Sequence, residues 1–403
     1  MRKKKDILFL CQFFHPEYIS SAQLPYETLL ALKAAGYQVG ALCGYPHEYL
    51  KSGSVPVREN VEGIEVRRLK YLQLDRSGFL GRLVNYFSFT FMVFLNLWRV
   101  ASYQTVVVYS NPPILPWIAS WAKLLFGTKL VFVSYDLYPE VATVTGTLRE
   151  GSIICRLMEH INKCVFRRSD RVVALSGEMK DYIVAHRDIP GEKVIVIPNW
   201  YSDQQKENVS RKENRFYEQV GDRFVVSYFG NMGTMQDMDT ILGAIRLLRK
   251  DPDVFFLFAG HGNKLQVLKN IVREEQLHNV QICDFLQGEA FRDALNISSC
   301  AFVSLEKGAT GLCVPSKTYS YMMQGLPLLA IMDECDIVRD IEQGAGRWVR
   351  NGESEKLAGH IREMAALPAA TEQMARVCRR LYLEKYTQPI CTGKYVELFR
   401  TLM

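Results

Sequence analysis

The sequence predicts an α/β protein made of two doubly wound domains in tandem, each with a parallel sheet covered by helices. The chain has 403 residues, which is more than one hydrophobic core usually organises. Short apolar runs alternate with helical patterns, as they do in parallel sheets that are buried on both faces. A single polar stretch near the middle interrupts this alternation. We therefore expect one domain on either side of that stretch.

The first half of the chain opens with a strand, a helix and a second strand. Residues 6–13 form a short apolar run, residues 24–35 have a helical pattern that Gly36 ends, and residues 37–43 form another apolar run. This order is typical of a parallel strand pair joined by a crossover helix. Further buried strands are predicted at residues 105–110, 129–134, 171–175 and 194–197.

The second half repeats the pattern after a polar stretch at residues 201–223, which we interpret as the interdomain linker. The predicted strands are residues 225–229, 254–259, 280–282, 300–305 and 328–331, and the predicted helices are residues 240–248, 264–274 and 317–324. Domains are therefore expected at residues 1–200 and 224–385. We expect the carboxyl ends of their strands to face a central cleft in which ligands bind.

Composition and charge exclude several classes of function. The ten cysteines are scattered without the spacing of zinc ligands, which favours reduced thiols in the cytoplasm and no metal site. Residues 1–200 contain 24 basic and 17 acidic residues, a net charge of +7, whereas the remainder carries −1. A basic half suits an anionic partner. Because no nucleic-acid motif accompanies these charges, we expect a membrane surface and no nucleic acid.

Residues 83–98 form an uncharged stretch rich in Phe, Leu, Met and Val, with arginines at 76, 82 and 99. As a helix it would be about 24 Å long, too short for a hydrocarbon core of about 30 Å. Two interpretations remain open. The helix is buried in the first domain, or its aromatic side dips into the membrane interface on the cytoplasmic face, as flanking arginines favour.

Three turns in the second domain suit phosphate binding. Residues 228–233 and 259–264 are rich in glycine and follow strands, where backbone N–H groups and a helix N-terminus can bind anions. Residues 314–317 place Ser316 as an N-cap before Lys317. A lysine in the first helical turn opposes the helix dipole, so a bound anion explains it better than helix stability does. Each turn taken alone is also ordinary α/β loop chemistry.

A series of short motifs runs in order along the whole chain. They are Phe-His-Pro-Glu at 14–17, Ser-Asn-Pro-Pro at 110–113, Asp-Leu-Tyr-Pro-Glu at 136–140, Ala-Leu-Ser at 174–176, Ile-Pro-Asn-Trp at 197–200, Phe-Gly-Asn-Met-Gly at 229–233, Pro-Ser-Lys at 315–317 and the stretch 322–327. Together they resemble the retaining family-4 glycosyltransferases of the GT-B fold. The resemblance points to the branch that builds capsule, O-antigen and colanic-acid-type polysaccharides.

The resemblance implies a role for particular residues. It implies a nucleotide-sugar donor bound by the second domain, an acceptor bound by the first, and a final helix within residues 386–403 that packs back on the first domain. Asp136 is then the candidate catalytic residue, with capping of the next helix as the alternative. The implied donor-binding residues are Asn231, Gly233, Gly262, Lys264, Ser316 and Lys317, and the acceptor-side candidates are His15, Glu17 and Glu140.

The sequence also departs from the family pattern. Two glutamates that many members carry fall on Leu312 and Ser320, and the usual Arg and Lys after the first glycine turn fall on Asn231 and on Gln236 or Asp237. The glycine pair of the first loop is replaced near residues 20–21. Lys317 and Lys264 are then expected to carry more of the phosphate charge. We also expect no D-x-D metal site, and hence no metal and no cofactor.

The function that follows is transfer of a sugar, most simply from a UDP-sugar and with retention, to a polyprenyl-diphosphate-linked glycan at the inner face of the cell membrane. Two alternatives stay open. A nucleotide-sugar 2-epimerase would share the fold and the donor site, but it would not need an apolar acceptor surface. A non-catalytic partner subunit would explain the missing glutamates.

Overall fold

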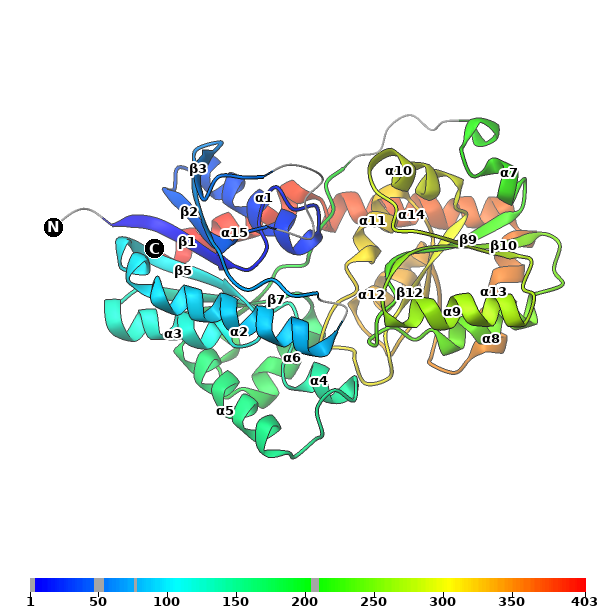
Figure 1. Cartoon of the computed structure of the whole chain (residues 1–403). Coiled ribbons are helices and arrows are strands. Elements are labelled where there is room, and N and C mark those ends of the chain that lie inside the picture. The colour runs from blue at the N-terminus through cyan, green and yellow to red at the C-terminus, as the bar shows by residue number, and fades with distance from the viewer. Residues whose placement is uncertain (1–3, 47–53, 76–77, 204–209) are drawn as a thin grey trace. The chain divides into compact units, whose positions relative to one another are not determined.

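The computed structural model describes residues 4–46, 54–75, 78–203 and 210–403 (Figure 1). The chain divides into two compact α/β units. Unit 1 comprises Met1–Asn199, Gly311–Val314 and Gln388–Met403, and unit 2 comprises Trp200–Thr310 and Pro315–Thr387. Both units contain a parallel sheet, so the predicted fold class of two doubly wound domains is confirmed.

Unit 1 contains an eight-stranded sheet in the order β3-β4-β2-β1-β5-β6-β7-β8. Its strands are β1 (Lys5–Cys11), β2 (Val39–Gly44), β3 (Arg58–Val61), β4 (Ile64–Leu69), β5 (Tyr103–Tyr109), β6 (Lys129–Val133), β7 (Arg171–Ala174) and β8 (Val194–Val196). All neighbours are parallel except β3, which pairs antiparallel with β4. The sequence did not predict β3 and β4. Three of the four residues of β3 are polar, and β4 contains Glu65, Arg67 and Arg68, so neither has the continuous apolar run of a central strand.

Helices and short 3₁₀ turns connect the strands of unit 1. They are α1 (Ser20–Ala34), α2 (Phe79–Leu95), η1 (Leu97–Ser102), α3 (Leu115–Phe126), α4 (Glu140–Val144), α5 (Ile153–Arg168), α6 (Gly177–His186), η2 (Gly191–Lys193) and α15 (Gln388–Leu402). The C-terminal helix α15 packs beside α1 (Figure 1). There the Phe399 ring lies 6.3 Å from that of Tyr37, and the Lys129 ammonium donates a hydrogen bond to the carbonyl of Leu402.

Unit 2 contains a six-stranded parallel sheet in the order β11-β10-β9-β12-β13-β14. The strands are β9 (Phe224–Asn231), β10 (Val254–His261), β11 (Val280–Cys283), β12 (Cys300–Ser304), β13 (Leu328–Ile331) and β14 (Gly346–Val349). The helices are η3 (Arg211–Glu213), α7 (Tyr217–Val220), α8 (Asp239–Leu247), α9 (Asn263–Glu274), α10 (Gly288–Ile297), α11 (Lys317–Gln324), α12 (Asp336–Asp340), the π-helical turn η4 (Ile341–Ala345), α13 (Ser354–Ala366) and α14 (Pro368–Lys385).

The described residues of the polar stretch at 201–223 belong to unit 2 and are hydrogen-bonded to it. Residues 204–209 lie outside the described part of the chain, and η3 and α7 follow them. The Arg211 guanidinium donates hydrogen bonds to the carbonyl oxygens of Gly221 at 3.2 Å, Ile297 at 3.1 Å and Arg223 at 2.7 Å. These bonds connect the stretch to the end of α10 and to the residue before β9. The polar composition of the stretch did not predict this attachment.

The apolar stretch at residues 83–98 is two-faced. Phe89 and Val93 are fully buried in the core of unit 1, and Leu97 is 4% exposed. On the opposite side the exposed fractions are 53% for Phe87, 59% for Phe91 and 59% for Trp98. The interpretation as a wholly buried helix is therefore wrong. Among the residues that the structure describes, no helix is long and apolar enough to cross a membrane, and Arg76 lies outside them.

The two faces of α2 should respond differently to truncation. We predict that Phe89→Ala lowers the free energy of unfolding by about 3–5 kcal/mol, because it leaves a cavity in the core. Phe91→Ala should change it by less than about 0.5 kcal/mol, because the ring is exposed to solvent. Urea denaturation of both variants measures the difference. Equal losses would contradict the two-faced arrangement of the helix.

Candidate functional site

Two glycine turns lie side by side at the carboxyl edge of the sheet in unit 2. In the register of β9 and β10, Gly230 is opposite Gly260 and Asn231 is opposite His261. The turns continue this pairing beyond the strands, because the Met232 amide donates to the His261 carbonyl at 2.7 Å. The backbone of both turns is thereby held as one surface.

Glycine is required in these turns by the lack of space. Gly260 has φ of +152°, and a Cβ added there would lie 1.9 Å from the carbonyl oxygen of Gly230. Gly262 has φ of +123°, and its Cβ would lie 2.4 Å from the carbonyl oxygen of Met232. At Gly233 the amide donates to Gln236 Oε1 at 2.8 Å. The glycines therefore let the two turns pack backbone against backbone, and glycine-rich turns at strand ends are common phosphate-binding elements.

Lys317 lies beside these turns. It begins α11 after Pro315 and Ser316, and its ammonium donates to the hydroxyl of Tyr228 and, at 3.2 Å, to the carbonyl of Asn231. Burial lowers the pKa of Lys317 to about 7, because a desolvated ammonium is disfavoured. A desolvated cation at a helix start, in contact with the end of a neighbouring strand, is an arrangement enriched at functional sites.

Ser316 occupies the N-cap position of α11, as predicted, but its side chain makes no capping hydrogen bond. Its backbone is helical, with φ of −61° and ψ of −23°, whereas a side-chain cap needs an extended N-cap residue. The predicted N-cap position is therefore confirmed, without the side-chain hydrogen bond that usually accompanies it. The exposed Ser316 hydroxyl remains available to a ligand.

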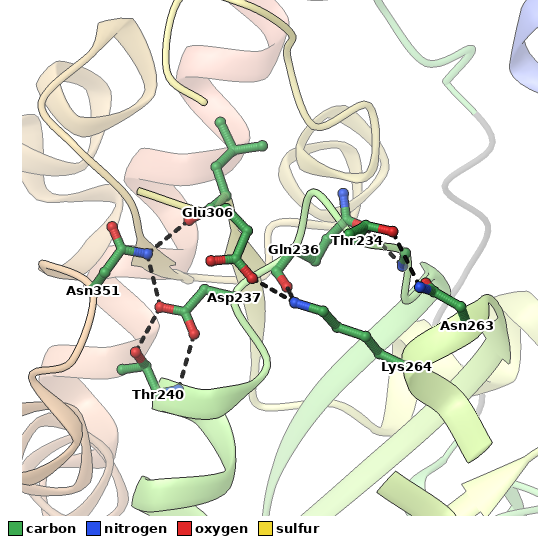
Figure 2. Close-up of polar contacts among 10 residues, drawn as sticks. Thr234, Gln236, Asp237, Thr240, Asn263, Lys264, Glu306 and Asn351 are labelled. Atoms are coloured by element: carbon green, nitrogen blue, oxygen red, sulfur yellow. Dashed lines mark hydrogen bonds and ion pairs between the residues drawn. The ribbon is translucent and has the colours of Figure 1, made fainter. Parts of the chain in front are cut away.

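Lys264 is held by neighbouring side chains and backbone (Figure 2). Its ammonium forms an ion pair with Glu306 Oε1 at 2.5 Å and donates to the carbonyl of Gln236 at 2.6 Å. The charge that the sequence assigned to phosphate binding is thus already balanced by a carboxylate. Sequence reasoning missed Glu306, although its position just after the buried strand β12 was an available signal.

The sequence contains two Asp-x-Asp triplets, at 237–239 and 251–253, so the expectation that no such triplet is present needs correction. Asp237 is buried and accepts hydrogen bonds from the Thr240 amide at 2.9 Å and from Asn351 Nδ2 at 2.7 Å (Figure 2). Asp253 precedes β10, at the opposite edge of the sheet. Within the described ranges no three His, Cys, Asp or Glu side chains are grouped to hold a metal ion.

Asp136 follows β6 in unit 1. Its amide donates to Ser110 Oγ at 3.1 Å, and its backbone forms an isolated bridge with Cys313. Helix α4 has Pro139 at its N-cap, so the alternative that Asp136 caps this helix is wrong. Burial raises the pKa of Asp136 to about 6. None of the described residues donates a hydrogen bond to its carboxylate, which leaves it available for chemistry.

The acceptor-side candidates also lie in unit 1. His15 stacks on Tyr26 with ring centroids 4.3 Å apart, and its carbonyl accepts a hydrogen bond from Arg68 at 2.8 Å. Burial, followed by the charge of Arg68, lowers the pKa of His15. Buried Glu17 accepts the amide of Phe14 at 3.2 Å. These residues follow β1 and form part of the carboxyl edge of that sheet.

Glu140 is engaged differently. Its Oε2 forms an ion pair at 2.5 Å with Arg187, whose side chain is 3% exposed. The Arg187 guanidinium also lies over the rings of Phe166 and Tyr182, at 5.7 Å and 5.8 Å from their centroids. Breaking a buried pair by removing one partner leaves an uncompensated charge, so this carboxylate has a clear structural role.

Two parallel-sheet units, the second with paired glycine turns beside a lysine, have the architecture of GT-B glycosyltransferases. Residues 25–200 match the model of the "Glycosyl transferase 4-like domain", and residues 210–380 match that of "Glycosyl transferases group 1". The chain belongs to the glycosyltransferases that combine these two domains, and it is an enzyme of that class.

Named relatives and solved structures agree with this assignment. "Probable glycosyltransferase WbjE" of Pseudomonas aeruginosa is 28% identical over 305 residues, which cover 74% of this chain and 75% of that protein. "Putative colanic acid biosynthesis glycosyl transferase WcaI" of Escherichia coli K12 is 22% identical over 180 residues, 44% of each chain. Anabaena Alr3699/HepE in complex with UDP-glucose shares the fold, with a TM-score of 0.72 at 16% identity over 98% of this chain and 100% of that one.

Asp136 should cost stability when it is ionised. Its pKa is about 6 in the folded protein and about 3.9 in an unfolded chain, so the folded state loses stability as the pH rises between these values. We predict that Asp136→Asn raises the free energy of unfolding by roughly 1–2 kcal/mol at pH 8. The gain should shrink towards pH 5. Thermal melts of both proteins across this pH range measure the difference in stability. A difference that does not change with pH would contradict the claim that ionised Asp136 destabilises the fold.

Proposed function

We propose that the protein transfers a sugar from a UDP-sugar to a lipid-linked glycan during synthesis of a cell-surface polysaccharide such as capsule or O-antigen, with retention of anomeric configuration. The observation that carries the proposal is the Lys317 ammonium at the glycine turns of unit 2. The name of the Escherichia coli relative supports polysaccharide synthesis. The UDP-glucose bound to the Anabaena protein supports a uridine nucleotide.

The donor diphosphate would be held by backbone and one cation. The turns ending at Gly233 and Gly262 admit phosphate oxygens to their backbone, and the N-terminus of α11 adds amide donors. Lys317 would supply the positive charge, because a nearby dianion stabilises its protonated form. The Ser316 hydroxyl offers another donor. The leaving diphosphate gains negative charge as the glycosidic bond breaks, and the same groups stabilise it without a metal or a cofactor.

The reacting sugar develops oxocarbenium-like positive charge. In the proposal, the Asp136 carboxylate either stabilises that charge or accepts the proton of the acceptor hydroxyl. A pKa of about 6 leaves it mostly ionised near pH 7, yet basic enough to take a proton. His15 and Glu17 are proposed to line the acceptor side, whereas Glu140 supports that side through Arg187.

The non-catalytic alternative has one observation in its favour. Leu312 is buried and its carbonyl accepts the amide of Leu137 at 2.9 Å, and the Ser320 hydroxyl donates to the Lys317 carbonyl at 2.8 Å. Neither position offers the carboxylate that many relatives use. Incubation with radiolabelled UDP-sugars and membrane lipid separates the candidates. We expect label in the lipid fraction. Label in an epimeric nucleotide sugar would favour the epimerase, and no turnover would favour the partner subunit.

UDP affinity should depend on the protonation of Lys317. Because its pKa is about 7 in the free protein, binding of the diphosphate must first protonate it at higher pH. We predict that UDP affinity falls roughly tenfold between pH 7 and pH 8.5. Lys317→Arg, which stays charged, should remove this dependence. Lys317→Ala should weaken binding by about 1.5–3 kcal/mol. Calorimetry measures each, and unchanged affinity in the alanine variant would exclude Lys317 from the site.

The proposal places the enzyme as a peripheral protein on the inner face of the cell membrane. The exposed side of α2 presents Phe87 and Phe91, and η1 presents Trp98, whose ring centroid lies 4.0 Å from the Arg99 guanidinium carbon. Apolar insertion combined with basic residues is the usual two-part signal for reversible binding to anionic lipid. The surplus of 24 basic over 17 acidic residues in residues 1–200 adds to the attraction.

Vesicle sedimentation tests the membrane contact. We predict that the protein binds anionic vesicles at low salt and binds less well at high salt, because surface charges are screened beyond about 8 Å at physiological ionic strength. The variant with Phe87, Phe91 and Trp98 changed to serine should lose binding and keep its thermal stability, because all three side chains are exposed. Leu247→Ser, an exposed apolar position in unit 2, is the matched control. Undiminished binding by the triple variant would exclude α2.

A further inference from the structure

Tyr228 is a buried tyrosine on β9, three residues before Asn231. Its ring is fully buried and stacks against that of Phe258 with centroids 6.0 Å apart. Its hydroxyl donates to the carbonyl of Asn231 at 3.0 Å and accepts a hydrogen bond from the Lys317 ammonium. The Lys317 nitrogen lies 3.8 Å from the centroid of the Tyr228 ring. One side chain therefore contacts both the lysine and the glycine turn.

We propose that Tyr228 is the positioning residue of the donor site, which fixes the Lys317 ammonium against the Asn231 turn so that both meet the donor diphosphate in one geometry. The inference rests on the proposed role of Lys317 in binding that diphosphate. Tyr228 itself does not touch the donor in this arrangement. It acts through the two groups that it holds.

The need for such a residue follows from the chemistry of lysine. A lysine side chain has four flexible carbons and loses much rotamer freedom when a ligand fixes its end. Here the hydroxyl of Tyr228 and the carbonyl of Asn231 already take two of the three N–H donors, and the ring face attracts the charge. The third donor is left for a ligand. Because the lysine side chain is already fixed before binding, the ligand does not have to offset that loss of entropy.

A second buried tyrosine provides the matched control. Tyr321 on α11 accepts the amide of Phe229 at 2.6 Å and donates to the carbonyl of the same residue at 3.2 Å. Its hydroxyl connects α11 to β9, and the hydroxyl of Tyr228 likewise connects Lys317 of α11 to β9. Both tyrosines are fully buried. Both hydrogen bonds of the Tyr321 hydroxyl are made with the backbone of Phe229 and not with Lys317. Loss of its hydroxyl therefore tests burial and strand support without loosening the lysine.

The experiment is a double-mutant cycle on the full chain with UDP as the probe and calorimetry as the measurement. We predict that Tyr228→Phe raises the Kd for UDP about tenfold, the usual effect of removing a hydrogen bond to a charged group. Tyr321→Phe should change it less than about twofold. In the Lys317→Ala background, Tyr228→Phe should add less than about twofold, because residues that act through one another are not additive.

Kinetics with the donor provide the second readout. For Tyr228→Phe we expect the KM for the donor to rise with little change in kcat, as for an interaction made equally in the ground and transition states. An effect on Kd equal to that of Tyr321→Phe would overturn the positioning role. So would a tenfold effect that persists without Lys317.

The failure of this inference is distinguishable from failure of the proposed function. If Lys317→Ala binds UDP as the native protein does, the donor site itself is misplaced and both proposals fail. If Lys317→Ala weakens binding but Tyr228→Phe does not, only the role of Tyr228 fails. Because phenylalanine retains the buried ring, thermal melts should place Tyr228→Phe within a few degrees of Tyr321→Phe. If Tyr228→Phe alone unfolds, its structural role overturns the inference.

Discussion

Burial of the Lys317 ammonium is the constraint on which the proposed donor site of unit 2 depends. Removing a charge from water is costly unless it is paired, and here its two partners are the neutral hydroxyl of Tyr228 and the carbonyl of Asn231. The pKa falls to about 7 as a consequence. The glycines beside it let the two turns pack backbone against backbone, since a Cβ at Gly260 would meet the carbonyl oxygen of Gly230 at 1.9 Å. The buried charge thus lies next to closely paired backbone.

Unit 1 contains the complementary case. Asp136 is a carboxyl whose pKa is raised by burial to about 6, and no described residue stabilises its ionised form with a hydrogen bond. Both groups are shifted towards their neutral forms and both lie at carboxyl ends of strands, β6 for Asp136 and β9 for the carbonyl that Lys317 contacts. Shifted pKa values of this kind are enriched at functional sites, where a group must change its protonation state or meet a charged ligand.

Other charges near the two sites are balanced, and the contrast is informative. Lys264 forms an ion pair with Glu306, and Glu140 forms one with Arg187. These pairs tie elements together and leave no net charge for a ligand. The number of cations near a predicted phosphate site is therefore a poor guide to its affinity. The balance of each cation with its neighbours decides how much attraction is left.

The sequence by itself determined the parallel sheets, the glycine turns and the position of Lys317, because these depend on local properties. Val106 to Val108 form a continuous β-branched run, which is typical of a strand covered on both faces, and all three are fully buried. Glycine at 260 and 262 and lysine after Pro-Ser are likewise local signals. They predicted where a donor diphosphate could bind.

Tertiary structure alone decided which partners these residues have. Lys264 and Glu306 are 42 positions apart in the sequence, and Tyr228 and Lys317 are 89 apart, so no pattern of neighbouring residues could pair them. The hydrogen bond from Arg211 to the Ile297 carbonyl spans 86 positions and was hidden for the same reason. A sequence records what each segment prefers. Strand order and crossover connections determine which segments are in contact. Those contacts determine which charged side chains are neutralised by a neighbour and which can still bind a ligand.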